Sequence, residues 1–496
     1  MSKNITKYLH QNMDKEAGIL HTIKRTKIVA TVGPACSTYE KLLELVVAGV
    51  NVFRLNFSHG SYEAKSEIIE FIREINRTQP FNIAILGDLQ GPKLRVGDLE
   101  GGQIELKDGS EFIFTTQKII GTPDKIYVSY KNLAKDVKVG ERIFLDDGKM
   151  ELRAEEILND TEVRVSVTLG GLLTPKKGVN LPDSALTMPS LTEKDIDDLE
   201  FIIEHDLDWV ALSFVRKAND IIDLKKRIKD KNSKIKVISK IEMPEALKNI
   251  RDIIVESDGV MIARGDLGVE VPVEQVPMIQ KEIIRKCMRR AKPVIVATQM
   301  MESMMERTKP NRSEVTDVAN AVLEGADAVM LSGETAMGHY PRLVVEMMSK
   351  IILEVEGTAY DYDRNDILAP QAHSPSLLSD ALCYTACKLA QDINANALVG
   401  MTQTGYTGFM LSSYRPKAPL FIFSKETTLI NQLSLSWGVR AIYYAEEESL
   451  DTIIFDQVNI LKERGFIKSA DVVVSTGSTP TKLHLPTNTL KITVVD

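Results

Sequence analysis

Two short apolar runs, at residues 237–238 and 260–262, constrain the fold of this chain more than any other feature. Each run stops abruptly at charged residues, Lys240-Ile241-Glu242 after the first and Arg264-Gly265-Asp266 after the second. The segment between them, 244–255, begins with proline and is predicted to be a helix. This is the pattern of a strand–helix–strand unit with charged residues after both strands. Parallel α/β folds place their chemistry at these carboxyl ends.

The same alternation recurs on both sides of this unit. We expect further strands before residue 90 and after residue 189. The complete set is predicted at 27–32, 50–55, 82–86, 209–214, 236–239, 259–263, 293–297 and 328–331. Eight parallel strands with intervening helices close a (β/α)8 TIM barrel, which is the predicted fold. A doubly wound open sheet is the alternative.

Between the third and fourth of these strands the pattern changes. Residues 92–187 show no good amphipathic helix, and turn residues separate short alternating segments at 103–106, 111–115, 126–130, 142–145 and 162–168. This pattern predicts a small all-β domain inserted into the barrel. From about residue 376 the alternation returns, with helices expected at 378–391, 427–437 and 450–464. The final segment is therefore predicted to be a separate α/β domain.

A chain of 496 residues is too long for one hydrophobic core, so two or three domains are expected. We predict a barrel domain made of 1–90 and 188–357, with 1–24 as an N-terminal arm or helix. The inserted β-barrel domain is predicted at 91–187 and the C-terminal α/β domain at 358–496.

The composition excludes several classes of protein. The net charge of −8 argues against a nucleic-acid binder, so any phosphate chemistry must use local cations. Four scattered cysteines do not make a disulfide framework, and Cys383 and Cys387 are interpreted as buried small residues rather than a metal pair. The first residues lack the apolar core of a signal peptide, and no apolar run is long enough to span a membrane. We expect a cytosolic protein.

Polar residues follow every predicted barrel strand. In a barrel these residues converge on one mouth, which predicts a binding site there. In chain order they are Gly33 and Pro34; Arg54, Asn56, Ser58 and His59; Asp88; Ser213; Lys240 and Glu242; Arg264 and Asp266; Thr298 and Gln299; Ser332 and Glu334.

The residue types at these positions indicate a chemistry. Glu242 and Asp266 are hard oxygen donors without a histidine or cysteine cluster, which favours Mg²⁺ or Mn²⁺ over zinc. Arg54, Lys240 and Arg264 are expected to bind or stabilise an anion. Cations, a divalent metal and backbone amides around one mouth suit phosphoryl transfer. No Walker A or GxGxxG sequence is present, so a nucleotide must be held differently.

Two other features are given structural interpretations. His59 is interpreted as a loop histidine that holds structure, with general-base catalysis as the alternative. The methionines at 300, 301, 304 and 305 are expected to pack against helices.

Five motifs occur in order along the chain: RLNFSHG at 54–60, SKIE at 239–242, MIARGDLG at 261–268, ATQM at 297–300 and LSGETA at 331–336. Together they strongly resemble the motifs of the pyruvate kinase family. The resemblance covers nearly the whole chain. It implies transfer of the phosphoryl group of phosphoenolpyruvate to ADP, giving pyruvate and ATP in the final step of glycolysis. It also implies a cytoplasmic homotetramer with no nucleic-acid or membrane partner.

The matching motifs imply roles for individual residues. The resemblance assigns the metal to Glu242 and Asp266 and the phosphoryl group in transit to Lys240. The catalytic set it implies is Lys240, Arg54, Thr298, Ser332 and Glu334, the last three near the path of the proton. The implied substrate contacts are Arg54, Lys240, Ala263, Arg264, Gly265, Asp266 and Thr298. The implied nucleotide contacts are Arg54, Asn56, His59, Arg95, Pro34 and Lys194.

The resemblance also makes the inserted domain, residues 91–187, a lid that excludes water and brings Arg95 to the nucleotide. Family members usually hold a monovalent cation at positions matching Asn56, Ser58, Asp88 and the backbone of Leu89. Potassium-dependent members carry glutamate at the position of Lys93 and Thr-Lys at 89–90, whereas this chain has Leu-Gln there. We therefore expect the ammonium of Lys93 to replace potassium. The alternative is that Lys93 faces solvent and the cation still binds.

The C-terminal domain resembles the effector domain of the family. Its possible phosphate-holding turn consists of Thr402, Gln403, Thr404, Gly405 and Thr407. The later loop at 477–486 lacks the glycine-rich run associated with fructose 1,6-bisphosphate. A sugar phosphate or a nucleotide effector remains open, and an ordinary surface turn is the alternative.

Two rival functions stay open at this point. One is a magnesium-dependent barrel lyase or mutase acting on phosphoenolpyruvate or a 2-oxo acid, which would turn over without ADP. The other is a non-catalytic metabolite sensor that uses the C-terminal domain. The presence of Lys240 and both carboxylates argues against the sensor.

Overall fold

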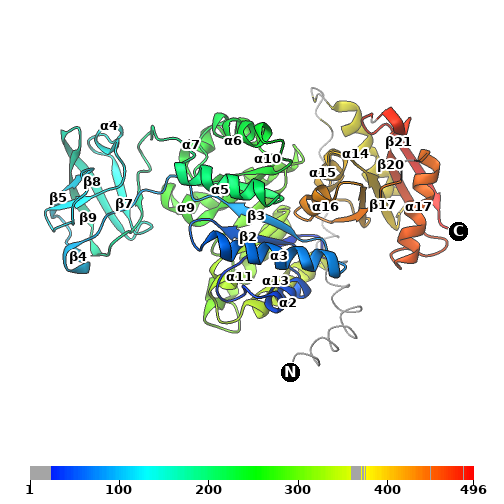
Figure 1. The fold of residues 1–496 in the computed structure, drawn as a ribbon, viewed down its shortest axis with the longest axis horizontal. Coiled ribbons are helices and arrows are strands. Elements are labelled where there is room, and N and C mark those ends of the chain that lie inside the picture. Colours follow the sequence, from blue (N-terminus) through cyan, green and yellow to red (C-terminus); the bar gives the residue numbers. More distant parts are fainter. Residues whose placement is uncertain (1–23, 359–369, 371–373, 375, 447, 484) are drawn as a thin grey trace.

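The computed structural model describes residues 24–358, 370, 374, 376–446, 448–483 and 485–496. Figure 1 shows three bodies in a row, with the inserted β domain at one end, the barrel in the middle and the C-terminal α/β domain at the other end. The expected N-terminal arm, apart from Lys24, lies outside the described residues.

Eight parallel strands close into a barrel in the order β1-β16-β15-β14-β13-β12-β3-β2. This closure confirms the predicted TIM barrel and excludes the open sheet. The inserted domain does not interrupt the sheet, because β12 pairs directly with β3, with Trp209 opposite Leu86. The strands are β1 (Lys27–Thr31), β2 (Val52–Asn56), β3 (Ala84–Asp88), β12 (Trp209–Leu212), β13 (Lys236–Ile241), β14 (Gly259–Ala263), β15 (Val294–Ala297) and β16 (Ala328–Leu331).

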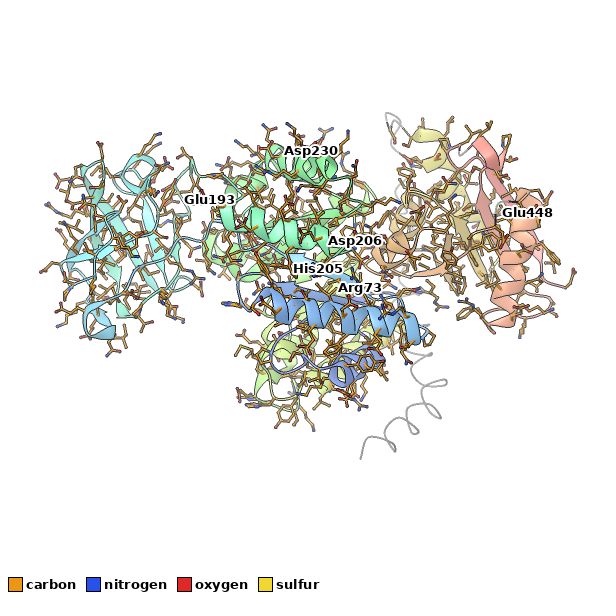
Figure 2. The ribbon with its side chains drawn as sticks, viewed as in Figure 1. Arg73, Glu193, His205, Asp206, Asp230 and Glu448 are labelled. Atoms are coloured by element: carbon orange, nitrogen blue, oxygen red, sulfur yellow. The ribbon has the colours of Figure 1, made fainter. Side chains whose placement is uncertain are left out.

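Helices surround this barrel, and their amphipathic faces cover the strands. The longer ones are α2 (Tyr39–Ala48), α3 (Tyr62–Thr78), α5 (Glu193–Glu204), α6 (Ala218–Asp230), α10 (Val276–Met288), α11 (Arg312–Glu324) and α13 (Pro341–Thr358). Short helices α9 (Arg264–Glu270) and α12 (Gly333–Ala336) begin directly after β14 and β16. Figure 2 labels Glu193 at the start of α5 and His205 just after its end, beside Arg73 of α3, whose guanidinium donates to the His205 carbonyl.

The prediction of a single helix at 244–255 is wrong, because the segment forms two helices. They are α7 (Pro244–Lys248) and α8 (Ile250–Glu256), separated at Asn249. The side-chain amide of Asn249 donates to the carbonyl oxygen of Arg216 over 2.9 Å. Asparagine has a low helix propensity, and here its side chain binds a segment 33 positions away rather than its own helix.

The inserted domain has its own hydrophobic core, as the alternation predicted. A six-stranded sheet, ordered β11-β7-β8-β9-β5-β6, lies with the two-stranded sheet β10-β4. The strands are β4 (Ile104–Leu106), β5 (Glu111–Thr115), β6 (Lys125–Tyr127), β7 (Arg142–Leu145), β8 (Met150–Asn159), β9 (Glu162–Leu169), β10 (Gly171–Leu173) and β11 (Val179–Asn180). The prediction missed β8, whose buried Met150, Leu152 and Ala154 do alternate with polar residues, and it missed the short helix α4 (Leu133–Asp136).

The C-terminal domain is a five-stranded sheet, ordered β19-β18-β17-β20-β21, with an antiparallel edge strand. Its strands are β17 (Ala397–Met401), β18 (Leu420–Ser424), β19 (Val439–Tyr443), β20 (Val472–Gly477) and β21 (Thr489–Val494). Its helices are α14 (Leu377–Asp392), α15 (Tyr406–Ser413), α16 (Thr427–Leu433) and α17 (Leu450–Glu463). The helix expected at 427–437 ends early, before a run of turns that reaches Gly438 with φ 68°.

The C-terminal domain docks on the amino ends of the barrel strands, the end opposite the polar mouth. Asp327, just before β16, pairs with Arg415 over 2.9 Å, and both side chains are almost fully buried. The same carboxylate accepts from the Trp437 amide over 3.0 Å. Leu435 completes the apolar cluster inside the barrel around Trp209. This arrangement leaves the mouth free for a site.

All four cysteines are buried and unpaired, and burial raises the pKa of Cys383 to about 12. The interpretation of Cys383 and Cys387 as buried small residues is confirmed. Within the described part of the chain, no helix has both the length and the apolar character to cross a membrane.

Candidate active site

Side chains from three barrel strands meet at the mouth. Arg54 of β2 binds Asp88 of β3 over 2.6 Å between Nε and Oδ2. Lys240 of β13 places its ammonium 3.4 Å from the other oxygen of Asp88. Asp88 is 1% exposed, and the two cations lower its pKa although burial opposes this. The polar strand ends therefore converge as the sequence predicted.

Lys240 is the centre of this cluster. Its ammonium lies 3.0 Å from Glu242 Oε1 and donates to Ser213 Oγ over 2.7 Å. Burial disfavours the charged ammonium, but Asp88 and Glu242 outweigh burial and raise its pKa. A lysine held in this way stays fully protonated and points its charge into the mouth.

The two carboxylates expected to hold a metal are neighbours. Glu242 is buried, and its Oε2 accepts from the Phe214 amide over 2.7 Å. Burial raises the pKa of Glu242, Lys240 opposes the rise, and the negative charge of Asp266 adds to it. Two carboxylates that repel each other beside one lysine are a place where a second cation is stabilising. The donor set is oxygen only, which fits Mg²⁺ or Mn²⁺.

This donor set is small. Among the described residues no group of three or more histidine, cysteine, aspartate or glutamate side chains is placed to hold a metal. Magnesium commonly takes only one or two carboxylates from a protein and its other ligands from phosphates and water. Glu242 and Asp266 therefore fit a metal that is shared with a substrate.

The ends of β14 and β15 are locked together by Thr298. Its hydroxyl accepts from the Gly265 amide over 2.7 Å and donates to the Ala297 carbonyl over 2.6 Å. A Cβ on Gly265 would lie 3.3 Å from Thr298 Oγ1, so glycine allows this close approach. Thr298 itself has φ 67°, an unusual backbone for threonine, which indicates a constrained loop.

The guanidinium of Arg264 is bound by other groups of the protein. It pairs with Asp317 of α11 over 2.7 Å and donates to the Thr298 carbonyl over 2.8 Å. Arg264 thereby holds the loop after β15 in place. The expectation that the Arg264 side chain binds an anion directly stays a prediction.

Glu334 ties the last two strand ends together. One carboxylate oxygen accepts from the Ser332 amide over 2.7 Å, and the other accepts from the Met301 amide over 3.1 Å. Burial raises its pKa, and these hydrogen bonds oppose the rise. Met300, Met301 and the nearby Met304 are fully buried, as the packing interpretation predicted.

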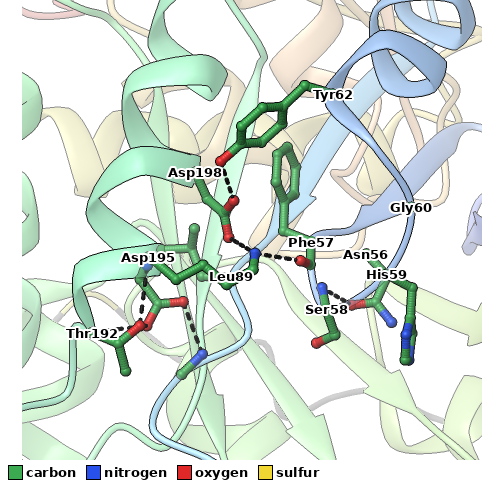
Figure 3. Close-up of polar contacts among 12 residues, drawn as sticks. Asn56, Phe57, Ser58, His59, Gly60, Tyr62, Leu89, Thr192, Asp195 and Asp198 are labelled. Atoms are coloured by element: carbon green, nitrogen blue, oxygen red, sulfur yellow. Dashed lines mark hydrogen bonds and ion pairs between the residues drawn. The ribbon is translucent and has the colours of Figure 1, made fainter.

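The segment 56–60, at the end of β2 and after it, is held by two lysines rather than by the side chain of its histidine. Figure 3 shows this segment. Lys65 donates to the carbonyl oxygens of His59 over 2.5 Å and Gly60 over 3.0 Å. Lys194 donates to the Phe57 carbonyl over 2.8 Å. The His59 side chain is exposed, so its structural role is carried by its backbone.

The remaining predicted site residues lie at the rim. Arg95 donates to the Lys176 carbonyl over 2.9 Å at the base of the inserted domain. Lys93 is exposed and lines a cavity of about 30 Å³ together with Asp266 and Glu270. No ion pair joins Lys93 to Asp88 within the described ranges. Pro34 is exposed at the edge of the mouth.

Sequence reasoning missed four residues that shape this mouth. Thr31 accepts from Arg54 over 3.0 Å, and Asp317 anchors Arg264. Asp198 binds Lys194 over 2.6 Å. Glu270 accepts from Asn180 of the inserted domain over 2.7 Å. Only Glu270 had a sequence cue, because it follows Asp266 by one helical turn.

A second candidate site is a cavity of about 730 Å³ in the C-terminal domain. The predicted turn lines it with Thr402, Gln403, Thr404 and Thr407. It is also lined by residues after β20, which are Gly477, Ser478, Thr481, Leu485, Pro486 and Thr487. Gly405, with φ 91°, precedes α15 and donates its amide to Thr402 Oγ1 over 3.0 Å. The start of a helix beside hydroxyl groups is a suitable environment for an anion.

Comparison with known proteins agrees with this architecture. Residues 23–345 match the model of the pyruvate kinase barrel domain, and residues 380–493 match that of the pyruvate kinase alpha/beta domain. A pyruvate kinase from Geobacillus stearothermophilus is 40% identical over 475 residues, which cover 95% of this chain and 80% of the relative. One from Bacillus licheniformis is 41% identical over 476 residues, covering 95% and 81%.

A solved structure gives the same result. The crystal structure of a pyruvate kinase from Cryptosporidium parvum superposes with a TM-score of 0.91 at 34% identity. The superposition covers 96% of this chain and 97% of that one. Two matched family models, close relatives and a shared three-part fold lead to one conclusion: this chain is a phosphate-transferring enzyme that belongs to the pyruvate kinase family.

Proposed function

We propose that this enzyme transfers the phosphoryl group of phosphoenolpyruvate to ADP in a reaction that depends on Mg²⁺ or Mn²⁺. The observation that carries the proposal is the cluster at the mouth, where Lys240 lies 3.0 Å from Glu242 and Asp266 adds a second negative charge. One oxygen–phosphorus bond of phosphoenolpyruvate breaks, and a bond to the terminal phosphate oxygen of ADP forms. The resulting enolate takes a proton to become pyruvate.

The residues of the mouth divide this work. Glu242 and Asp266 hold the divalent cation, which supplies positive charge against the phosphoryl oxygens when it is bound. Lys240 stabilises the phosphoryl group in transit, and Arg54 contacts it from the side of β2. Because Asp88 and Ser213 hold these cations in place, little reorganisation accompanies the transfer.

The substrate carboxylate is assigned to the turn made by Ala263, Arg264, Gly265 and Asp266, together with Thr298. Arg264 contributes by bracing the loop, since its guanidinium is bound to Asp317. Thr298, Ser332 and Glu334 line the path by which the enolate receives its proton through water. The buried Glu334 keeps the loops after β15 and β16 in register.

The nucleotide is assigned to the rim opposite the carboxylate turn. We place its contacts at Arg54, Asn56, His59, Arg95, Pro34 and Lys194. The inserted domain, assigned to residues 91–187, would close over the mouth and exclude water, so that the phosphoryl group reaches ADP rather than water. The proposed barrel domain consists of residues 1–90 and 188–357, and the proposed C-terminal domain of residues 358–496.

We propose that potassium is not required. The support is the sequence at the monovalent-cation positions Asn56, Ser58, Asp88 and Leu89, together with Lys93. Asp88 is already neutralised by Arg54 and Lys240. The exposed Lys93 lies at the entrance of the mouth, where lid closure would bring its ammonium inward.

The C-terminal cavity is proposed to bind the phosphate of a sugar phosphate or a nucleotide. The support is its lining of hydroxyl groups from Thr402, Thr404 and Thr407. We also propose that the enzyme is a homotetramer that acts in glycolysis in the cytoplasm.

The test is pyruvate formation from phosphoenolpyruvate, followed by coupling to lactate dehydrogenase, with four mixtures. They contain ADP and Mg²⁺, ADP with a chelator, Mg²⁺ without ADP, and neither. Activity in the first mixture alone is expected. Pyruvate release with Mg²⁺ and no ADP would favour a lyase instead, and no activity in any mixture would favour a sensor.

A further inference from the structure

Asp198 is a buried carboxylate on the second turn of α5. Its contacts connect α5 to α3 and, through Lys194, to the loop after β2. Its side chain is fully buried, and none of the chemical roles proposed above is given to it. One oxygen accepts from the phenol of Tyr62, at the start of α3, over 2.7 Å, and the other binds the ammonium of Lys194 over 2.6 Å. Figure 3 shows both contacts as dashed lines. Burying a carboxylate is unfavourable unless such partners are present.

The lysine held by Asp198 also binds the loop after β2. The Lys194 ammonium donates to the Phe57 carbonyl over 2.8 Å, while its side chain remains 49% exposed. An ammonium has three N–H donors, and two of them are used in these contacts. The third is left on the exposed side of the chain, where the nucleotide phosphates are assigned.

The loop itself depends on these contacts for its shape. Phe57 lies between Asn56 and Ser58, two of the polar residues of the rim. The ring of Phe57 has the ammonium of Lys65 5.0 Å from its centre, and the carbonyl of Phe57 is held by Lys194. Asn56 is held by its pairing with Asp88 in the barrel sheet, so a shift of Lys194 would act on the Phe57 carbonyl and on Ser58 after it.

The support behind Asp198 is rigid. The first turn of α5 is closed by Thr192 and Asp195, whose side chains and amides bond reciprocally. Asp195 also accepts from the Gly91 amide over 3.0 Å, at the point where the chain enters the inserted domain. On the other side, the phenol of Tyr62 donates to Asp198, and burial together with this bond raises the pKa of Tyr62 to about 12.

We propose that Asp198, supported by Tyr62, is a positioning residue for the nucleoside diphosphate: it sets the Lys194 ammonium and the loop after β2 for the phosphates. This inference rests on the proposed function, because it assumes that ADP binds at this rim. The effect should fall on the nucleotide, since most phosphoenolpyruvate contacts lie at the ends of β13, β14 and β15. The one on β2, Arg54, is held by Asp88 and Thr31 rather than by Lys194. A residue with a purely structural role would affect both substrates alike.

The test is steady-state kinetics of Asp198→Asn with each substrate varied in turn. Asparagine keeps the shape and can accept from Tyr62, but it loses the ionic contact to Lys194. The KM for ADP is expected to rise about fivefold or more, because a charge-assisted hydrogen bond is lost. The KM for phosphoenolpyruvate is expected to stay within about twofold. Asp197→Asn, an exposed neighbour on α5, is the matched control and should change neither value.

Tyr62→Phe is the second variant, which removes only the hydroxyl group of Tyr62 and keeps the contact between Asp198 and Lys194. It should raise the KM for ADP by about twofold or more in the same direction. If Asp198→Asn does not fold, as judged by its melting temperature, Tyr62→Phe decides the question alone. An unchanged KM for ADP in the folded variants, or equal rises for both substrates, would overturn the inference. Absence of ADP-dependent activity in the unaltered enzyme would instead contradict the proposed function.

Discussion

The hydroxyl of Ser213 donates to the carbonyl oxygen of Leu89 over 2.8 Å. The same hydroxyl accepts from the Lys240 ammonium over 2.7 Å. Leu89 follows β3 directly and lies two residues before Gly91, where the chain leaves for the inserted domain. A single, almost fully buried side chain therefore connects the lysine of the mouth to the entry of the inserted domain.

We expect Ser213→Ala to lower kcat about tenfold, because Lys240 loses a fixed acceptor and its position becomes less defined. Ser213→Thr keeps the hydroxyl and should retain most of the activity. Stopped-flow or steady-state rates at saturating substrates measure the effect. Equal activity of the alanine variant and the unaltered enzyme would show that Asp88 and Glu242 suffice to hold the lysine.

Replacement of Lys240 by methionine should reduce kcat by at least about a hundredfold, since a charge directed at the transition state in a dry site contributes about 3 kcal/mol or more. The substitution also removes the lysine partner of the buried carboxylates Asp88 and Glu242, which is expected to lower stability. The melting temperature must therefore be measured together with the rate. A folded variant that keeps kcat within tenfold would remove Lys240 from the chemistry.

Asp208, at the junction of the barrel and the C-terminal domain, should make stability depend on pH. Burial raises its pKa to about 7, although the Ile85 amide, Asn431 and Arg73 oppose the rise. The folded protein therefore binds this proton more tightly than the unfolded chain does. The stabilising contribution is complete below about pH 4 and is lost as the pH rises towards 7.

The measurement is the free energy of unfolding of Asp208→Asn and of the unaltered chain between pH 5 and 8. The asparagine variant should gain relative stability as the pH rises, by an amount on the order of 3 kcal/mol. Asp206→Asn, an exposed neighbour labelled in Figure 2, is the matched control. Parallel curves for the unaltered chain and Asp208→Asn would mean that Asp208 is ionised throughout.

Potassium should not alter the rate of the unaltered enzyme when tetramethylammonium is the background cation. Lys93→Glu removes the ammonium and adds a carboxylate, so this variant should require potassium for full activity. Lys107→Glu, a charge reversal on the exposed part of the inserted domain, controls for the change in charge. A strict potassium requirement in the unaltered enzyme would discard the role given to Lys93.

The barrel could be predicted from sequence because its strands are buried on both faces and read as short apolar runs. Strand ends were less certain. The third strand was expected at 82–86, but it reaches Asp88, since this carboxylate is buried and neutralised by Arg54 and Lys240. A charged residue inside a strand looks like its end until its partners are known.

The site could be predicted as a set of residues but not as a set of contacts. Lys240 and Glu242 are two positions apart at the end of one strand, so the sequence alone could predict that they lie close together. Arg264 instead binds Asp317, which lies 53 positions away, and Lys194 binds the Phe57 carbonyl from 137 positions away. Such pairs depend on how the helices pack around the barrel, which the local pattern does not encode.

Phosphorus-31 NMR of a mixture of phosphoenolpyruvate, ADP, Mg²⁺ and the enzyme tests the central claim most directly. Phosphoryl transfer predicts that the phosphoenolpyruvate signal falls while the γ-phosphate signal of ATP rises in equal amount, with little inorganic phosphate. Loss of phosphoenolpyruvate into inorganic phosphate, or no change in any signal, would contradict it.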